Sequence, residues 1–289
     1  MDDAPLLIAD VPWLLYRSFF ALPKSIKGAD GQPVNALLGT VNALLIAIEA
    51  RPPRAVVACF GAEQARYRVE LYPPYHAHRD PMPAELATQW PQAPALLASF
   101  GWTIAEADEL EADDAMGSFA HVEAQAGGRA LLLSGDRDMY QAVGDRVSVL
   151  DLGKGGAVSE LDVEQVLERY GVTPAQVPDF IALRGDPSDG LPGAPGIGAK
   201  TAADLLRAHG TLEGVLAAAD GEEHMRPRTA AALRENAELL LTFKQVATLV
   251  EIDVKRPGDR PTDFAGGAQA AGELGMKRLA ERLTSLQET

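Results

Sequence analysis

The sequence predicts an α/β fold in which helices flank a central, mostly parallel sheet. Short apolar runs occur at 5–10, 55–61 and 129–136, and helical patterns at 34–50 and 112–126 lie between them. Apolar strands that alternate with helices are typical of parallel sheets. After about residue 160 the patterns become helical. We therefore expect an α/β core over 1–160 and a helical region with a C-terminal tail over 161–289.

The composition is that of a globular protein. Hydrophobic residues make up 47% of the 289 residues and charged residues 23%, which suits one large core or two domains. The N-terminus lacks the basic region of a secretory signal. The most apolar stretch, 34–50, carries Asn35, Asn42 and Glu49, which favours a buried helix over a membrane span. The single cysteine, Cys59, excludes an intrachain disulfide, so we expect a cytoplasmic protein.

The net charge of −15 argues against a generic nucleic-acid coat protein, because phosphate binding needs Lys and Arg. It does not exclude a nuclease. Acidic residues concentrated at one site can be neutralised by divalent metals, and local basic surfaces can still hold DNA.

Each element follows from its local pattern. The runs 5–10, 55–61 and 129–136 have strand length, and 147–151 predicts a further strand. The apolar positions of the 112–126 helix share one face: Ala115, Met116, Phe119 and Val122. Beyond residue 160, three glycines sit just past predicted helices, as C-cap residues do: Gly171, Gly185 and Gly210. The tail from Lys255 predicts a loop and then a short helix over 269–287.

Residues 61–95 form a long excursion between two core elements. The segment is rich in Arg, His, Tyr and Pro and shows no clear period until about Ala84. Long connections of this kind are usually functional or mobile.

Acidic residues gather where the apolar runs end. Asp10 closes the first run, and Asp136 and Asp138 close the third. In an open α/β sheet, ligands bind at the carboxyl ends of the strands, so these side chains should project into one crevice. Three acids at the start of the 112–126 helix could face the same crevice: Glu111, Asp113 and Asp114. The loop 183–190 adds two more: Asp186 and Asp189.

These eight carboxylates predict a metal site. Taken one at a time, these acids have ordinary explanations. Acidic residues at a helix N-terminus, as at 111–114, offset the helix dipole. The segments 134–138 and 185–190 have the composition of turns. Together, without cations, the eight carboxylates would raise each other's pKa. Two divalent ions, Mg²⁺ or Mn²⁺, would remove that conflict, and could activate water and stabilise the leaving oxygen of a phosphodiester. No Cys/His spacing indicates zinc.

A glycine-rich turn follows the second acidic loop. Gly196, Ile197 and Gly198 lead into a helix that starts near Lys200 and Thr201. Exposed N–H groups at such a helix start can bind phosphate, and Lys200 adds charge. A plain turn is the alternative.

Five stretches together resemble the 5′-nuclease superfamily, in particular bacterial 5′–3′ exonucleases and flap endonucleases like the N-terminal nuclease domain of DNA polymerase I. They run in the family's order from about residue 5 to 216: LLIADVPWLLYRSFFALP, LYPPYHAHRDPMP, LEADDAMG, LLLSGDRDMYQ and FIALRGDPSDGLPGAPGIGAKTAADLL. The resemblance implies a free-standing enzyme that hydrolyses phosphodiester bonds near the 5′ end of branched or flapped DNA.

The resemblance also assigns roles. It implies a first metal cluster of Asp10, Glu111, Asp113 and Asp114, and a second of Asp136, Asp138, Asp186 and Asp189. It makes 61–95 a helical arch over single-stranded DNA. Residues of the arch and pocket would engage DNA near the scissile phosphate: Arg17, Tyr75, His76 and Arg79. The segment 174–206 would be a helix–turn–helix element that grips duplex DNA, with a bound K⁺. We expect a monomer, and nothing in the sequence indicates protein partners.

Two positions depart from the family pattern. Gly61 stands where the family usually has a metal-binding Asp, and His76 where it usually has Lys. Either Glu63 reaches back towards the first metal, or a water completes the metal shell. The departures motivate an alternative, a DNA-junction-binding protein that has lost catalysis. A related metal-dependent ribonuclease is a weaker alternative, because 184–206 argues for duplex DNA.

Overall fold

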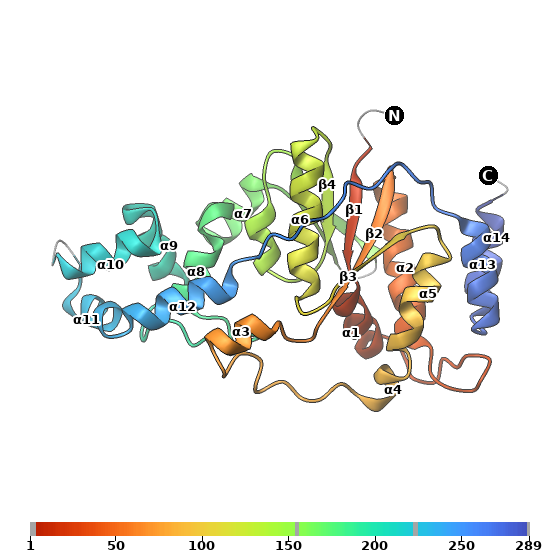
Figure 1. Ribbon diagram of the computed structural model, residues 1–289, viewed down its shortest axis with the longest axis horizontal. Coiled ribbons are helices and arrows are strands. Elements are labelled where there is room, and N and C mark those ends of the chain that lie inside the picture. Colours follow the sequence, from red (N-terminus) through yellow and green to blue (C-terminus); the bar gives the residue numbers. More distant parts are fainter. Residues whose placement is uncertain (1–3, 154–155, 222–224, 288–289) are drawn as a thin grey trace.

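The computed structural model describes residues 4–153, 156–221 and 225–287. Its centre is a six-stranded sheet with the strand order β3-β2-β1-β4-β5-β6 (Figure 1). Strands β1 to β5 are parallel and β6 is antiparallel to β5, which confirms the mostly parallel sheet. The strands are β1 (Leu6–Asp10), β2 (Ala55–Gly61), β3 (Thr103–Ala107), β4 (Ala130–Leu133), β5 (Val147–Leu152) and β6 (Val158–Leu161).

The sheet separates two hydrophobic clusters. Along β1, Leu6 and Ile8 face one cluster and Leu7 and Ala9 the other, because successive side chains of a strand point to opposite faces. Helix α6 (Ala112–Gln125) covers the first face. Three helices cover the second: α1 (Val11–Ala21), α2 (Asn35–Ala50) and α5 (Ala93–Ala98).

The strand order reverses between β1 and β4. In open α/β sheets, the crevice at such a switch point, beyond the carboxyl ends of the strands, is where ligands bind. Asp10 is the last residue of β1, and 134–138 follow β4 directly. The fold thus brings the ends of the first and third predicted strands together. The short helix η2 (Asp138–Ala142) comes next.

The predicted arch segment 61–95 is helical only near its ends. It contains α3 (Arg66–Leu71), α4 (Ala84–Ala87) and η1 (Trp90–Gln92), while 72–83 is neither helix nor strand. Figure 1 shows this stretch passing below α1. Prolines, which lack the N–H that a helix interior needs, explain the irregular stretch: Pro73, Pro74, Pro81 and Pro83.

The C-terminal region is helical, as predicted, and the part of it before residue 248 lies on one side of the sheet (Figure 1). Its elements are α7 (Val163–Tyr170), η4 (Pro174–Gln176), α8 (Val177–Arg184), α9 (Ala199–His209), α10 (Leu212–Asp220), α11 (Pro227–Glu235) and α12 (Ala237–Ala247). Gly171, Gly185 and Gly210 cap their helices with positive φ, as expected. The loop 185–198 joins α8 to α9 and is longer than the three- or four-residue turn of a helix–turn–helix motif, so that detail of the expectation stays a prediction.

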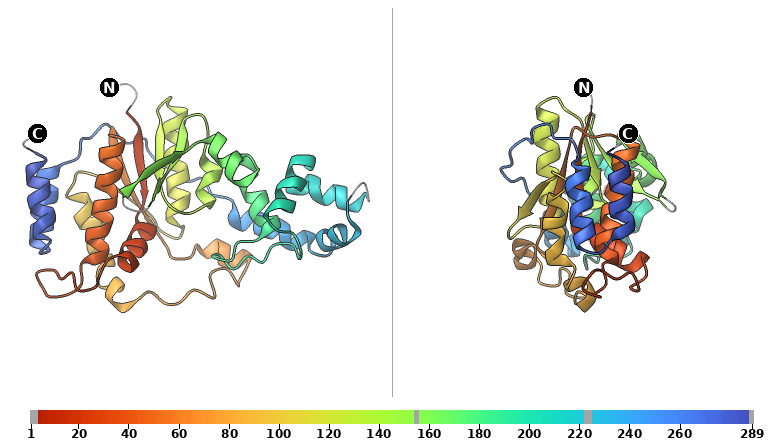
Figure 2. Two further views of the ribbon diagram at one scale, coloured as in Figure 1. Left: turned by 180° about the vertical axis from the view of Figure 1, so that it is seen from behind. Right: turned by 90° about the vertical axis from the view of Figure 1, so that its right-hand side faces the viewer.

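The tail differs from the prediction of one helix over 269–287. Residues 248–263, here called the strap, cross the molecule without helix or strand, and two helices follow: α13 (Phe264–Glu273) and α14 (Lys277–Ser285). Gly275 ends the first helix with φ +80°, where a Cβ atom would meet the backbone of Gly28 and Ala29. Figure 2 shows the pair lying outside α2.

Within the described residues, no helix has both the length and the apolar character needed to cross a bilayer. The apolar stretch at 34–50 is the buried helix α2, as predicted. At its start, the amide of Asn35 donates to the carbonyl oxygens of Phe19 and Leu22. Cys59 is a buried free thiol on β2.

Candidate metal centre

The first part of the site lies at the switch point of the sheet. Asp10 is 5% exposed; its carboxylate accepts from the backbone N–H of Trp13 at 2.9 Å and from Ser134 Oγ at 2.8 Å. The same hydroxyl accepts from the backbone N–H of Asp136 at 3.1 Å. Ser134 therefore joins the ends of β1 and β4. The sequence analysis missed it, although its place at the end of an apolar run was a usable signal.

The carboxylates of this part of the site repel one another. Burial, Asp136 and Glu111 raise the pKa of Asp10 to about 6, although the bonds from Trp13 and Ser134 lower it. Burial and the charges of Asp10, Asp136 and Glu111 raise the pKa of Asp113 well above its usual range. Asp10, Glu111, Asp113 and Asp136 therefore lie close enough for their charges to act on one another.

The second part of the site is continuous with the first. Burial and four carboxylates, those of Asp136, Asp189, Asp186 and Asp113, raise the pKa of Asp138 well above its usual range. The loop that carries Asp186 and Asp189 is closed by paired backbone hydrogen bonds between Asp186 and Leu191. Asp113 contributes to both parts. Seven of the eight predicted carboxylates thus interact: Asp10, Glu111, Asp113, Asp136, Asp138, Asp186 and Asp189.

Asp114 is the exception, and the expectation that it faces the metals needs correction. It is fully buried and forms two bonds with Arg68, at 3.0 Å and 2.8 Å. It also accepts from the backbone N–H groups of Val250 and Glu111. Burial would lower the pKa of Arg68, but Glu111 and Asp114 more than offset this and raise it. The carboxylate of Asp114 is therefore occupied in holding α3, α6 and the strap together.

Arg68 is a second residue that the sequence analysis missed. It lies on α3, and its Nε donates to the carbonyl oxygen of Val246 at the end of α12. Its guanidinium is also 3.3 Å from Glu111 Oε1. No pattern in RYRVEL distinguishes this buried arginine from its exposed neighbour Arg66.

The arch segment contacts Glu111 directly. The hydroxyl of Tyr75 donates to Glu111 Oε2 at 3.0 Å, and the backbone N–H of Ala65 donates to Oε1 at 2.7 Å. Burial and Glu111 raise the pKa of Tyr75, so its hydroxyl stays protonated and remains a donor. Tyr75 therefore orients a candidate metal ligand.

The arch also contacts Asp189. Arg79 Nη2 donates to Asp189 Oδ1 at 3.1 Å, and Arg79 Nε donates to the carbonyl oxygen of Ser188. His76 Nε2 lies 3.0 Å from the same Oδ1 atom. We expected His76 to engage DNA, but its side chain is 2% exposed and stacks on Tyr75 with ring centroids 3.8 Å apart. It faces a candidate metal ligand instead of solvent.

The structure explains why position 61 carries no side chain. A Cβ atom at Gly61 would overlap the backbone of Glu111 and Ala112 and lie 2.7 Å from the carbonyl oxygen of Leu110. An aspartate does not fit there without a backbone shift. Glu63 has another partner, because its carboxylate accepts from the hydroxyl of Tyr16 at 2.9 Å. Its contacts give no support to the idea that it replaces the missing ligand.

Arg17 lies apart from the carboxylates. Its guanidinium stacks on Trp13, 5.5 Å from the ring centroid, and donates to the carbonyl oxygen of Leu152 at 3.1 Å. The structure therefore places Arg17 at the carboxyl end of β5, without a bond to the acidic cluster.

The glycine turn before α9 is exposed and open. Gly196 has φ +78°, Gly198 is the N-cap of α9, and no side-chain bond caps this helix. Lys200 is exposed and Thr201 partly so. Ile197 needs correction as a DNA contact, because its side chain is buried and its N–H donates to the carbonyl oxygen of Ala194.

The donor set fits hard divalent ions. All seven interacting side chains offer carboxylate oxygens, the ligands that Mg²⁺ and similar ions prefer. Among the described residues, no group of three or more His, Cys, Asp or Glu side chains is already drawn together around a common point as a metal site, so the fit rests on the donor chemistry alone. A bound dication would also relieve the repulsion that raises these pKa values.

Comparison with known proteins assigns the whole chain to a family. The family model "5'-3' exonuclease, N-terminal resolvase-like domain" matches residues 5–171, and "5'-3' exonuclease, C-terminal SAM fold" matches 172–260. A 5′–3′ exonuclease of Mycobacterium tuberculosis is 35% identical, with 99% of this chain and 98% of the relative covered.

Two further similarities concern larger and more distant proteins. DNA polymerase I of Mycobacterium bovis is 37% identical over 85% of this chain, which spans 27% of the polymerase. The structure of a bacteriophage T5 flap endonuclease with DNA and metal ions shares the fold, with a TM-score of 0.68, 19% identity, and 99% of this chain and 100% of that chain covered. The family models and the close relatives agree: the chain belongs to the 5′–3′ exonuclease family of nucleases.

Proposed function

We propose that the protein is a free-standing, metal-dependent 5′–3′ exonuclease and flap endonuclease that acts on DNA with a free 5′ end. One observation carries the proposal: seven carboxylates converge at the switch point of the sheet, directly beside the arch segment. The M. tuberculosis exonuclease, covered over 98% of its length, supports the free-standing form. The T5 flap endonuclease, solved with DNA and metal ions, supports the substrate and the cofactor.

Two divalent ions, Mg²⁺ or Mn²⁺, are the proposed cofactors. Asp10, Glu111 and Asp113 would hold the first ion, and Asp136, Asp138, Asp186 and Asp189 the second. When bound, such ions supply an activated water and stabilise the leaving oxygen of a phosphodiester. Ser134 keeps Asp10 and Asp136 in register, and Tyr75 orients Glu111.

The remaining residues act on the DNA itself. Arg79 is 45% exposed beside Asp189, so its charge can turn to the scissile phosphate and stabilise the charge that develops there. The amides at the start of α9, together with Lys200, would receive the phosphates of the duplex. We further propose a K⁺ ion at the loop 185–198 between α8 and α9.

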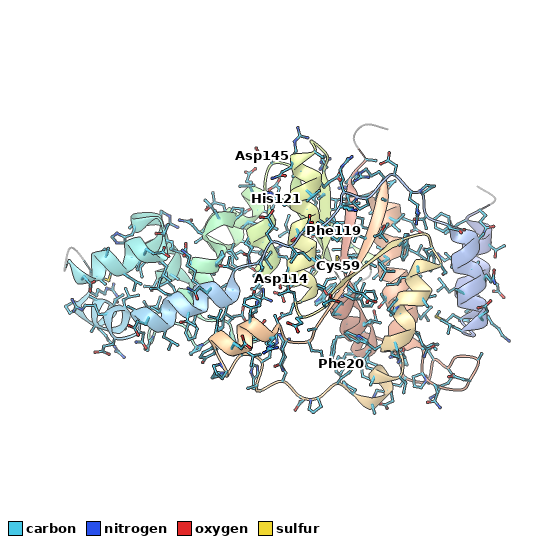
Figure 3. All side chains as sticks on the ribbon, in the orientation of Figure 1. Phe20, Cys59, Asp114, Phe119, His121 and Asp145 are labelled. Atoms are coloured by element: carbon cyan, nitrogen blue, oxygen red, sulfur yellow. The ribbon has the colours of Figure 1, made fainter. Side chains whose placement is uncertain are left out.

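Cleavage of a 5′-flap substrate with and without Mg²⁺ or Mn²⁺ tests the proposal. Asp136→Asn and Asp186→Asn should each abolish most cleavage and leave flap binding within a few-fold. Asp145→Asn is the matched control, because Asp145 is exposed before β5, at the amino end of the sheet, far from Asp114 in Figure 3.

Near-native cleavage by either site variant would remove that residue from the metal centre. Flap binding without cleavage in either metal would favour the junction-binding alternative. Preferential cleavage of an RNA flap would favour the ribonuclease.

A further inference from the structure

The imidazole of His76 lies between two hydrogen-bond acceptors. Nδ1 is 3.2 Å from the carbonyl oxygen of Glu63, and Nε2 is 3.0 Å from Asp189 Oδ1. Neither a carbonyl nor a carboxylate oxygen can donate, and a neutral imidazole carries only one N–H. With one N–H for two acceptors, one of the two ring nitrogens presents a lone pair to its neighbour.

We propose that His76 Nε2 is a nitrogen ligand of the second metal ion, shared with Asp189. The proposal rests on the two-metal function above. Two adjacent ligands of an octahedral ion, each about 2.1 Å from the metal, lie about 3.0 Å apart. The observed separation of Nε2 and Oδ1 is 3.0 Å, which equals the separation of two adjacent ligands of one ion.

The other contacts of His76 are those of a metal-bound histidine. Such a histidine almost always donates its second N–H to a carboxylate or a backbone carbonyl, which fixes the tautomer. With the ring hydrogen on Nδ1, facing the carbonyl oxygen of Glu63, the lone pair of Nε2 is available on the side of the ring where Asp189 lies. A carboxylate oxygen has two lone pairs, so Oδ1 can keep its bond from Arg79 and still bind the ion.

The backbone holds His76 in this position. Its N–H donates to the carbonyl oxygen of Asp189 at 3.2 Å, so the two residues are joined through main chain as well as side chain. Among the described non-glycine residues, His76 alone has a positive φ, +54°. Side chains rarely adopt that conformation without a functional or structural reason. Together with the stacking on Tyr75, it directs the ring towards the acidic cluster.

A nitrogen ligand changes which metal the site prefers. Carboxylates and water suit Mg²⁺, whereas imidazole suits first-row transition metals, which bind nitrogen more tightly. The second site should therefore favour Mn²⁺ over Mg²⁺ more strongly than a site built from carboxylates alone. Where the family pattern has lysine, this chain has a residue that selects the metal.

Pulsed electron paramagnetic resonance of the Mn²⁺-loaded full-length protein tests this directly. The native protein should show ¹⁴N modulation, which ¹⁵N-histidine labelling shifts. His76→Asn should lose the signal, and asparagine is chosen because it tolerates positive φ. His209→Gln, at the end of α9, is the matched control and should keep it.

Calorimetric titration gives a second measure that does not depend on cleavage. His76→Asn should reduce the ratio of Mn²⁺ to Mg²⁺ affinity by about tenfold, a change typical for loss of a group at a metal site. His209→Gln should leave the ratio unchanged. Melting temperatures without metal check that both variants fold.

Three results would overturn the inference. They are native protein without ¹⁴N modulation, modulation that persists in His76→Asn, and an unchanged affinity ratio in that variant. Each would leave His76 as a hydrogen-bond partner of Asp189 and not a metal ligand. If the Asp136→Asn and Asp186→Asn results still hold, the proposed nuclease stands without this ligand. Native protein that binds no Mn²⁺ would overturn both proposals.

Discussion

At the scale of single residues, the type of side chain and its place at a strand end were enough to predict most of the site. Asp10 and Asp136 meet because parallel strands end at a common edge. The role of Asp114 could not be predicted in this way. Neighbours on a helix point about 100° apart, so only one of Asp113 and Asp114 can face the crevice. Which one does so depends on Arg68, from a distant segment.

Asp113 and Asp114 should therefore respond oppositely to the same substitution. Asp114→Asn removes the carboxylate that binds Arg68 through two hydrogen bonds, leaves Glu111 as the remaining counter-charge of this buried arginine, and should lower the free energy of unfolding by about 3 kcal/mol. Asp113→Asn removes repulsion by Asp10 and Asp136 and should stabilise the metal-free protein. Urea unfolding in the presence of EDTA measures both. Equal losses in the two variants would contradict this division of roles.

Gly61 is constrained by the backbone that packs against it. Gly61→Ala should lower the free energy of unfolding by about 1–3 kcal/mol and reduce cleavage, because the new Cβ pushes on Glu111. Gly61→Asp should do the same, although the family pattern has Asp at this position. Gly258→Ala is the control, since nothing lies within 4 Å of its Cβ position. If Gly61→Asp cleaved faster than the native protein, the backbone at Glu111 and Ala112 would have to shift enough to accommodate the new side chain.

At the scale of elements, the buried central strands could be predicted from the sequence, whereas the strands at the two edges of the sheet could not. The sequences of β1, β2 and β4 are apolar runs because both faces of these strands are buried. Strand β3 (TIAEA) lies at the edge of the sheet and β6 (VSEL) at the other, and most of their residues are partly exposed. Their sequences therefore lack a continuous apolar run. The break between α13 and α14 depends on a contact of Gly275 with a distant loop.

The start of α9 gives a prediction about DNA binding. Lys200→Ala should weaken binding of a flap substrate and reduce the salt dependence, the slope of log K against log salt, by about one unit. Arg207→Ala is the control on the same helix, because Arg207 is paired with Asp204 in the last turns. Fluorescence anisotropy at several salt concentrations measures the slopes. An unchanged slope for Lys200→Ala would mean that Lys200 meets no phosphate.

At the scale of the whole molecule, the strap ties the helical region, the metal centre and the sheet together. It runs along α6, where the N–H groups of Val250 and Ile252 donate to Asp114 and Ser118, one helical turn apart. Further on, Arg256 bonds to Glu123 of the same helix. The local sequence of the strap has no pattern that predicts this path, since each bond joins residues more than 130 positions apart.

Glu123 is the buried end of this attachment, and its charge should govern the acid stability of the protein. The side chain is fully buried between Arg54 and Arg256. Burial would raise its pKa, but the two arginines outweigh burial and lower it below the usual value. A carboxylate with a lowered folded-state pKa stabilises the protein above its unfolded pKa of about 4.3, and this contribution is lost as the pH falls through the folded-state value.

Glu123→Gln should therefore cost about 3 kcal/mol of unfolding free energy at pH 7, because the buried guanidinium of Arg54 loses its buried partner charge and the partly exposed Arg256 loses the same partner. The difference from the native protein should shrink below about pH 4, where the native carboxylate also becomes protonated. Glu251→Gln, a change on the strap at a 69% exposed side chain, should cost little at any pH. Urea unfolding at a series of pH values measures all three proteins. A gap that stays constant from pH 7 to pH 3.5 would show that Arg54 and Arg256 hold the strap through hydrogen bonds alone, independently of the charge of Glu123.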